Sequence, residues 1–333
     1  MKSFLDLADL SPGEVEDLLG LAARLERRPE PEALKGKILA LLFFNPSLRT
    51  LASFQAGMAR LGGSSFVISP GQGTWILETR DGVVMDGAAA EHVREAIPVL
   101  AGYADALGIR SFAGGADLAA DLADSTFLSM AGVCPVPLVN LESAVNHPCQ
   151  ALGDWKTMDD LGIPARSGKF VLTWAWHPKP LPLAVPAAAV HMAALRGMEV
   201  TVLRPEGFGL PEPVLEKARQ AAELSGGSLR ETDDRDEALA GANVIYAKSW
   251  TSPLHYGDPA AEASLRAGLR DWCVDEDWFA KAAPDCRFMH CLPVRRNVVV
   301  KDSVLDGPRS VVVHEARNRL WAQMAVLHRL LRG

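Results

Sequence analysis

Short apolar runs alternate along the chain with longer stretches of helical periodicity, and this alternation constrains the fold more than any other feature. Apolar runs of this kind are typical of parallel strands that helices cover on both faces. We therefore predict an α/β fold of two domains, each with a mainly parallel sheet flanked by helices. The expected strands are residues 38–44, 65–69, 107–112, 136–141, 170–176, 199–203, 243–248, 272–275 and 287–292. The expected helices are residues 50–61, 91–103, 117–130, 149–161, 186–196, 213–224 and 315–331.

The length indicates how the chain divides. Its 333 residues exceed the roughly 100 to 200 residues of a single domain, so we expect two. We place the boundary so that residues 1–148 form the first domain, completed by the C-terminal segment 315–333, and residues 149–314 form the second. Apolar residues at helical spacing predict that the last segment is a helix packing on the first domain. They are Leu320, Met324, Leu327 and Leu331.

Charge and cysteine content narrow the class of protein. The formal net charge is −7 and no block of lysine and arginine stands out, so we expect no nucleic-acid partner and no membrane partner. The longest apolar run, residues 38–44, is too short to span a bilayer, and Asp6 and Asp9 interrupt a start that a signal peptide would keep apolar. The chain has five cysteines, which are odd in number and widely spaced. This pattern fits a reducing compartment better than a framework of disulfides. We predict a cytoplasmic protein.

Common cofactor motifs are missing from the sequence. Gly168-Lys169 follows Gly162 at the wrong spacing for a phosphate loop, and Phe170 replaces the serine or threonine that would follow. No G-x-G-x-x-G follows the first strand of either half, so a dinucleotide has no support. Cys286, His290 and Cys291 lack the spacing of a zinc site. We expect no cofactor and no metal.

One strand-to-helix turn has the properties of an anion site. The strand at residues 38–44 runs into Asn45-Pro46-Ser47-Leu48-Arg49-Thr50, and a helical apolar pattern follows. Ser47 is a natural N-cap, the helix N-terminus favours a negative charge, and Arg49 and Thr50 add a cation and a hydroxyl. Serine caps and first-turn arginines also occur in many α/β proteins without any ligand, so this turn alone does not establish a phosphate-binding site.

Three more polar groups follow predicted strands, and a fourth lies in the last helix. They are Arg110, the run His147-Pro148-Cys149-Gln150, the run His290-Cys291-Leu292-Pro293, and Arg319. Ligands of open α/β sheets bind at the carboxyl ends of strands, where the first three belong. Each one alone has an ordinary structural explanation as a surface pair, a cap or a core residue. Their occurrence together in one chain is more informative than any one of them alone.

Together these segments resemble the aspartate/ornithine carbamoyltransferase family over essentially the whole chain. Residues 47–50 are similar to its Ser-x-Arg-Thr carbamoyl-phosphate signature, residues 147–150 to its H-P-x-Q motif, and residues 290–293 to its H-C-L-P motif. The combination, in this order, is very specific. It implies the carbamoyltransferase fold and transfer of a carbamoyl group from carbamoyl phosphate to an amine.

The resemblance assigns roles to individual positions. The residues that it implies for the phosphate are Ser47, Leu48, Arg49, Thr50, Arg110 and Arg319, and those that it implies around the carbamoyl group are His147, Gln150, Cys291 and Leu292. Three arginines and a helix N-terminus can neutralise a phosphate without a metal. Thr50, Arg110 and His147 can donate to the oxygen that becomes negative in the tetrahedral intermediate. We count Cys291 with them as catalytic.

Other segments resemble the narrower branch that carbamoylates N-acylated ornithine. They are the proline-rich loop 176–182, residues 73–75 with 78–79, and residues 247–250. In that branch the tryptophan matching Trp75 reaches into the carbamoyl-phosphate site of a neighbouring subunit, which implies a homotrimer with shared active sites. Residues matching Glu142, His177 and Lys248 contact the acylated ornithine in that branch.

The choice of acyl group depends on one pocket position. Acetyl-using relatives carry a glutamate there, whereas this chain has Ala90 followed by Glu91. A buried glutamate would repel the second carboxylate of a succinyl group, and alanine leaves room for it. Arg295 or Arg296 can supply a cation for that carboxylate. We predict N-succinyl-L-ornithine as the amine and N-succinyl-L-citrulline as the product in arginine biosynthesis, with N-acetylornithine as the alternative substrate.

The signature departs from the family at one residue. Leu51 stands where a second arginine normally follows the threonine. If that arginine supports the phosphate loop, affinity for carbamoyl phosphate falls, and at the extreme the chain is a catalytically silent binding subunit. A silent homologue would be expected to lose Arg49, His147 or Arg319, and this chain keeps all three. We therefore favour the enzyme.

Overall fold

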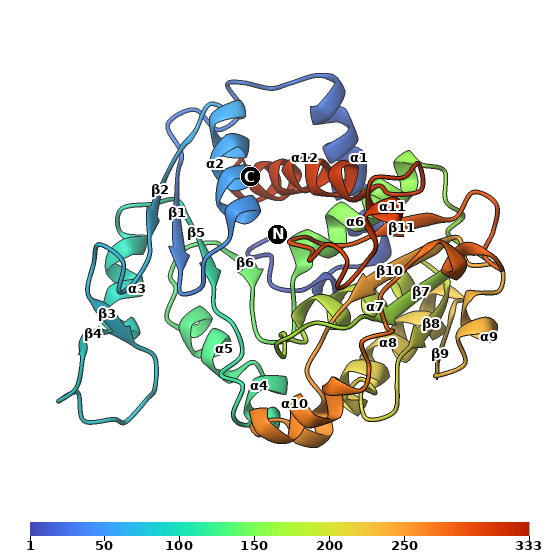
Figure 1. The fold of residues 1–333 in the computed structure, drawn as a ribbon. Coiled ribbons are helices and arrows are strands. Elements are labelled where there is room, and N and C mark those ends of the chain that lie inside the picture. Colours follow the sequence, from blue (N-terminus) through green and yellow to red (C-terminus); the bar gives the residue numbers. More distant parts are fainter. Residues whose placement is uncertain (333) are drawn as a thin grey trace. The chain divides into compact units, whose positions relative to one another are not determined.

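The computed structural model describes residues 1–332, which divide into two compact units. Unit 1 contains Met1–Gly114, Ala119–Cys149 and the C-terminal residues from Arg319 onward, and unit 2 contains Gly115–Leu118 and Gln150–Asn318. Each unit has its own parallel sheet, and helices flank the strands (Figure 1). The predicted α/β class is confirmed. Among the described residues, no helix combines the length and the apolar character needed to cross a membrane.

The sheet of unit 1 has the strand order β2-β1-β5-β6, with every pair parallel. Its strands are β1 (Ile38–Phe43), β2 (Ser64–Ile68), β5 (Ala106–Arg110) and β6 (Leu138–Glu142). Two short strands, β3 (Ile76–Glu78) and β4 (Ala89–His92), pair separately. The helices are α1 (Pro12–Arg27), α2 (Leu48–Arg60), α3 (Val93–Ala101), α4 (Leu118–Leu122), α5 (Ser125–Gly132) and the part of α12 (Val312–Leu331) from Arg319 onward, with the 3₁₀ turn Leu7–Asp9. Since β1, β5 and β6 are almost wholly buried, their sequences are mainly apolar up to the polar residues that end β5 and β6, with Asn140 as a buried polar residue within β6.

The sheet of unit 2 has the order β11-β10-β7-β8-β9 and is also parallel (Figure 1). Its strands are β7 (Lys169–Trp174), β8 (Glu199–Leu203), β9 (Ser228–Thr232), β10 (Val244–Lys248) and β11 (Arg287–Met289). Its helices are α6 (Pro148–Asp160, from Gln150), α7 (Ala184–Leu195), α8 (Glu212–Ser225), α9 (Arg235–Leu239), α10 (Pro259–Ala267) and α11 (Asp302–Leu305), with 3₁₀ turns at Pro253–His255 and Glu276–Phe279. Helix α7 is buried on all sides, which explains its uniformly apolar sequence.

One predicted strand is wrong, and several elements were not predicted. Residues 272–275 form no strand, although Trp272, Cys273 and Val274 are buried and Val274 makes an isolated bridge. Burial alone made this run apolar, and periodicity cannot separate a buried strand from a buried irregular segment. The sheet-edge strand β9 was missed because its sequence, Ser-Leu-Arg-Glu-Thr, is polar. Helix α1 was missed despite a capping box between Ser11 and Glu14.

Helices α2 and α12 approach closely at a glycine. A Cβ atom at Gly57 would lie 3.2 Å from Cγ of Met324 and 3.8 Å from Cδ1 of Leu320. Both neighbours belong to the apolar stripe of the last helix, so the absence of a side chain at Gly57 lets the two helices pack tightly. This close approach brings the first turn of α2 near Arg319, one residue before that stripe.

We predict that Gly57→Leu destabilises the protein by about 1–3 kcal/mol, because the new side chain overpacks the contact with α12. The matched control is Gly20→Leu in α1, where a Cβ would meet nothing within 4 Å and where loss of a helical glycine stabilises by about 0.5–1 kcal/mol. Urea unfolding followed by circular dichroism measures both changes. Equal free energies of unfolding for the two variants would contradict the close packing.

Candidate active site

The first turn of α2 forms the centre of the site in unit 1. Strand β1 ends at Phe43, and Ser47 then caps α2 by accepting a hydrogen bond from the Thr50 backbone N–H at 3.3 Å. Asn45 holds the turn, since its Oδ1 accepts from the Phe112 N–H beyond β5 at 2.8 Å. Leu48 points its side chain outward at 78% exposure, so it can offer a ligand only its backbone. The helix N-terminus is therefore fixed at the carboxyl end of the sheet.

Thr50 connects the two helices of this site. Its side chain is buried, and its Oγ1 accepts a hydrogen bond from Nη2 of Arg319 in α12 at 2.7 Å. Because this bond uses an acceptor lone pair, the Thr50 hydroxyl keeps its proton for donation to a ligand. Two sequence segments 269 residues apart thus meet at one hydroxyl group.

Arg110 and Glu142 form a buried ion pair beside this helix. They are the last residues of β5 and β6, they face each other in the sheet register, and a guanidinium Nη1 donates to the carboxylate. The Arg110 guanidinium also lies 4.5 Å from the ring centre of Phe112. His147 lies against the same carboxylate, with Nε2 3.4 Å from Oε2 of Glu142. Sequence resemblance assigned Glu142 to the acylornithine, and that role stays a prediction; in this structure it holds Arg110.

Positive charge dominates these buried groups. Burial lowers the pKa of Arg319 below its ordinary value, and the nearby charges of Arg49 and Arg110 lower it further, while Cys149 and Glu142 act in the opposite direction. Nε of Arg110 and Nε of Arg319 are buried without a hydrogen-bond partner among the described residues. The guanidiniums of Arg49, Arg110 and Arg319 act on one another at this site, beside the Glu142 carboxylate, and a multiply charged anion would stabilise such a group of cations.

Unit 2 contains the second half of the H-P-x-Q motif and the H-C-L-P motif. The Gln150 side-chain amide, 2% exposed, donates from Nε2 to Oδ1 of Asp154 at 2.7 Å and to Oε1 of Glu315 at 3.1 Å. The Leu292 backbone N–H donates to Nδ1 of His290 at 2.8 Å. Leu292 has a φ of +55°, a left-handed conformation that is uncommon for leucine and that defines the turn around Cys291.

A second group in unit 2 gathers cations around His177. Nε of Arg295 donates to Nε2 of His177 at 3.0 Å, and Nδ1 lies 2.8 Å from the Lys179 carbonyl oxygen. This pairing favours the neutral tautomer with its proton on Nδ1. Burial lowers the pKa of His177, and the charges of Arg295 and Lys248 lower it further. His177 therefore acts as a hydrogen-bond acceptor that orients Arg295, near a second cation.

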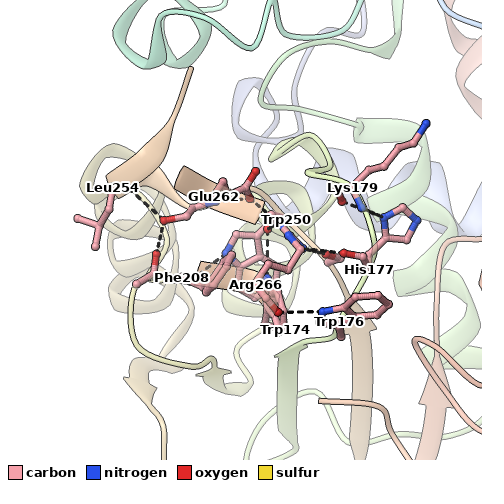
Figure 2. Close-up of polar contacts among 12 residues, drawn as sticks. Trp174, Trp176, His177, Lys179, Phe208, Trp250, Leu254, Glu262 and Arg266 are labelled. Atoms are coloured by element: carbon pink, nitrogen blue, oxygen red, sulfur yellow. Dashed lines mark hydrogen bonds and ion pairs between the residues drawn. The ribbon is translucent and has the colours of Figure 1, made fainter. Parts of the chain in front are cut away.

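Arg266 of α10 joins the two loops beside this group (Figure 2). It pairs with Glu262, donates from Nη1 to Ser249 Oγ at 2.9 Å and to the His177 carbonyl at 3.4 Å, and donates from Nη2 to the Trp250 carbonyl at 3.1 Å. Trp174 and Phe208 each place a ring centre 5.2 Å from its guanidinium. One buried arginine thereby fixes the proline-rich loop to the segment after Lys248.

Ala90 lies in β4 of the separate β3–β4 pair of unit 1, and Trp75 immediately precedes β3. Trp75 is 59% exposed and donates from Nε1 to Oε2 of Glu91 at 2.8 Å. Ile76 pairs with Ala89 and Leu77 with Glu91, so Ala90 is the extra, exposed residue of a bulge.

Two of the buried cysteines have thiols of low reactivity, and the described side chains form no metal-ligating cluster. No group of three or more histidine, cysteine or acidic residues in the described chain could hold a metal. Burial raises the pKa of Cys149 and of Cys286 to about 12, so both stay protonated thiols near neutral pH.

Comparison with known proteins defines the class. Residues 2–160 match the carbamoyl-P binding domain of the aspartate/ornithine carbamoyltransferase family, and residues 185–330 match its Asp/Orn binding domain. The chain belongs to the aspartate/ornithine carbamoyltransferase family and is an enzyme of the carbamoyltransferase class. The alternative of a silent binding subunit thus receives no support.

Three relatives narrow the comparison. The chain is 41% identical to an N-acetylornithine carbamoyltransferase of Xanthomonas campestris pv. campestris, over 99% of this chain and 98% of the relative. It is 35% identical to an N-succinylornithine carbamoyltransferase of Bacteroides thetaiotaomicron, over 100% and 99% of the two chains. The third is a crystal structure of an N-acetyl-L-ornithine transcarbamylase variant in which one glutamate is replaced by alanine, complexed with carbamyl phosphate and N-succinyl-L-norvaline. It superposes with a TM-score of 0.95 at 41% identity, covering 99% of this chain and 100% of that one.

Several residues that organise the site were not predicted from the sequence. They are Asn45, Asp154, Tyr246, Glu262, Arg266 and Glu315, which hold the predicted residues and were not themselves singled out. Glu315 precedes Arg319 by one helical turn, and this spacing was the only local signal available for it.

We predict that Arg49→Ala lowers the affinity for inorganic phosphate about tenfold or more, because a charge-assisted interaction contributes about 1.5–3 kcal/mol. The matched control is Arg60→Ala at the other end of α2, where the guanidinium lies over the Trp321 ring. Isothermal titration calorimetry at constant ionic strength gives both dissociation constants. Equal affinities for the two variants would exclude Arg49 from the anion site.

Proposed function

We propose that this enzyme transfers the carbamoyl group of carbamoyl phosphate to the δ-amine of N-succinyl-L-ornithine, giving N-succinyl-L-citrulline and phosphate. The observation that carries the carbamoyl-phosphate part is the cluster of Arg49, Arg110 and Arg319 at the N-terminus of α2. Residues 1–148 with the C-terminal helix bind carbamoyl phosphate, and residues 149–314 bind the acylornithine. Ser47, the Leu48 backbone and Thr50 complete the phosphate site.

The chemistry requires charge stabilisation more than proton transfer by the protein. The neutral amine attacks the carbonyl carbon, a C–N bond forms, and the C–O bond to phosphate breaks. Negative charge develops on the carbonyl oxygen, where Thr50, Arg110 and His147 act as donors. Gln150 and the backbone carbonyls near Cys291 and Leu292 accept from the carbamoyl NH2, and the proton lost by the amine leaves with the phosphate.

The charges of unit 2 support an amine that carries more than one carboxylate. The charges of Arg295, Lys248 and Arg266 all lower the pKa of His177, and since Arg266 is paired with Glu262, Arg295 and Lys248 are the two cations near that ring that we assign to the amine. An N-succinyl group adds a second carboxylate to the α-carboxylate of ornithine, and Arg295, which His177 orients, is available for it. N-acetylornithine would use only one of these cations for a carboxylate.

The residue at position 90 supports the same substrate. Ala90 is the exposed, bulged residue of β4, and its neighbour Glu91 is held by Trp75. The N-acetyl-L-ornithine transcarbamylase variant complexed with N-succinyl-L-norvaline has one glutamate replaced by alanine, the residue type that this chain carries at position 90. An alanine there removes the repulsion that a glutamate would exert on the succinyl carboxylate.

N-acetyl-L-ornithine is the second candidate substrate. The specific observation in its favour is the higher identity to the Xanthomonas campestris N-acetylornithine carbamoyltransferase, 41% against 35% for the Bacteroides N-succinylornithine enzyme. Overall identity reports the whole chain, whereas the acyl group is selected by a few pocket residues.

We also propose a homotrimer in which Trp75 completes the carbamoyl-phosphate site of a neighbouring subunit. The segment around β3 and β4 exposes several large apolar side chains, namely Trp75, Ile76, Val84 and Met85. Clustered apolar exposure of this kind marks a surface that another protein covers.

Parallel assays of product formation test the substrate. With carbamoyl phosphate present, we expect turnover of N-succinyl-L-ornithine to exceed that of N-acetyl-L-ornithine and L-ornithine, because only the succinyl compound engages both cations. Detection of the ureido group of the product measures all three reactions. Preferential turnover of the acetyl compound would keep the carbamoyltransferase and replace the proposed amine.

A single substitution tests the pocket argument. Ala90→Glu is expected to lower kcat/KM for the succinyl substrate about tenfold or more relative to the acetyl substrate, since it places two carboxylates together at a cost of at least 1.4 kcal/mol. Ala88→Glu, two residues earlier and also exposed, is the matched control. An unchanged ratio in Ala90→Glu would show that this position does not face the acyl group.

A further inference from the structure

Glu315 is a fully buried carboxylate in the first turn of α12, and its two oxygens contact two different motifs. Oε1 accepts from Nε2 of Gln150 at 3.1 Å and from the Tyr246 hydroxyl at 3.5 Å. Oε2 accepts from the His290 backbone N–H at 2.9 Å. The H-P-x-Q residue and the H-C-L-P turn of unit 2 are therefore connected through one side chain.

These contacts determine which way the Gln150 amide faces. Asp154 and Glu315 both accept from its Nε2, at 2.7 and 3.1 Å, so both of its N–H bonds point at carboxylates. Its Oε1 is buried and has no hydrogen-bond partner among the described residues. A flipped amide would place the oxygen against two carboxylates that can only accept. The amide is thus fixed with its acceptor oxygen directed away from both acidic side chains.

The same carboxylate holds the backbone of the H-C-L-P turn. Glu315 accepts a hydrogen bond from the His290 backbone N–H, and Nδ1 of the His290 ring accepts one from the Leu292 backbone N–H at 2.8 Å. With these two N–H groups occupied, the backbone groups that His290 and Leu292 can still offer to a ligand are their carbonyl oxygens. The left-handed φ of +55° at Leu292 costs free energy, and the bonds around His290 help to hold it.

We propose that Glu315 is the positioning residue that makes this half of the site recognise an NH2 group: it orients the Gln150 oxygen and the His290–Leu292 turn so that the site offers acceptors. The inference rests on the proposed function, because it assigns these acceptors to the carbamoyl NH2. Glu315 itself does not touch the substrate. It selects the carbamoyl group against an isosteric acyl group in which a methyl replaces the NH2.

A carboxylate fits this task better than a neutral side chain. Two donors on different segments, the Gln150 amide and the His290 N–H, need two acceptor atoms, and an amide at position 315 could supply only one. Burial together with Asp154 and Glu315 raises the pKa of Tyr246 well above its ordinary value of 10, so the tyrosine stays a neutral donor toward these groups. The first turn of a helix is also a favourable place for the negative charge of Glu315.

The test compares the dissociation constants of carbamoyl phosphate and acetyl phosphate, measured without amine by intrinsic tryptophan fluorescence. The two probes share the phosphate and the carbonyl and differ in NH2 against CH3. We expect the wild-type enzyme to prefer carbamoyl phosphate, and Glu315→Gln to lower that preference about five- to tenfold, the effect of a lost buried hydrogen bond. Affinity for inorganic phosphate should stay unchanged, since Arg49, Arg110 and Thr50 are untouched.

The matched control is Glu231→Gln, which makes the same change at a unit 2 carboxylate that accepts the Leu210 backbone N–H at 3.0 Å. It should leave the preference as in the wild type. If Glu315→Gln does not fold, Asp154→Asn removes the other carboxylate from the Gln150 amide and should lower the same ratio without touching His290. In a Gln150→Ala background, most of the effect of Glu315→Gln should disappear, because its partner is absent.

Two results would contradict different claims. A Glu315→Gln enzyme that folds, binds phosphate and keeps the wild-type preference for carbamoyl phosphate would overturn the positioning role while leaving the proposed function intact. A wild-type enzyme that neither binds nor consumes carbamoyl phosphate would overturn the proposed function itself.

Discussion

The collection of three guanidiniums at the N-terminus of α2, with one carboxylate beside them, is the constraint on which the rest of unit 1 depends. Like charges in a poorly solvated site repel, and burial adds a desolvation cost to each of them. The lowered pKa of Arg319 reflects both effects. The fold offsets part of this cost through the Thr50 hydroxyl and the Glu142 carboxylate. The remaining positive charge is what a phosphate dianion would neutralise, so binding and stability are linked at this site.

Unit 2 uses buried charge for a different purpose, the orientation of neighbouring groups. Arg266 fixes two loops through their carbonyl groups, and Glu262 together with aromatic rings stabilises the buried guanidinium, whose pKa burial lowers. Glu315 orients an amide and a backbone turn in a similar way. In each case one buried ion determines the direction of several neutral donors and acceptors. This precision is what discrimination between similar acyl groups requires.

Much of the fold and of the site was predictable from local patterns. Apolar runs identified the buried strands of both sheets, and polar residues such as Arg110 marked the carboxyl ends of some of these strands. Ser47 predicted the start of α2 correctly, because an N-cap depends only on neighbouring residues. The groups that orient the site were harder to predict. Glu315 lies 165 residues from Gln150, and no local pattern in either segment predicts that the two side chains are in contact. The prediction of a strand at residues 272–275 was wrong for a related reason: this segment is apolar because it is buried in the tertiary structure, and it does not belong to a sheet.

The most direct test of the central claim is the thermal unfolding of the native chain in increasing concentrations of inorganic phosphate, with ionic strength held constant by potassium chloride. If the arginine cluster is an anion site of the folded state, phosphate stabilises by RT ln(1 + [L]/Kd), about 2.7 kcal/mol at one hundred times the dissociation constant. The account predicts a midpoint that rises with the logarithm of phosphate concentration and does not rise with chloride alone. A midpoint that phosphate leaves unchanged would contradict it.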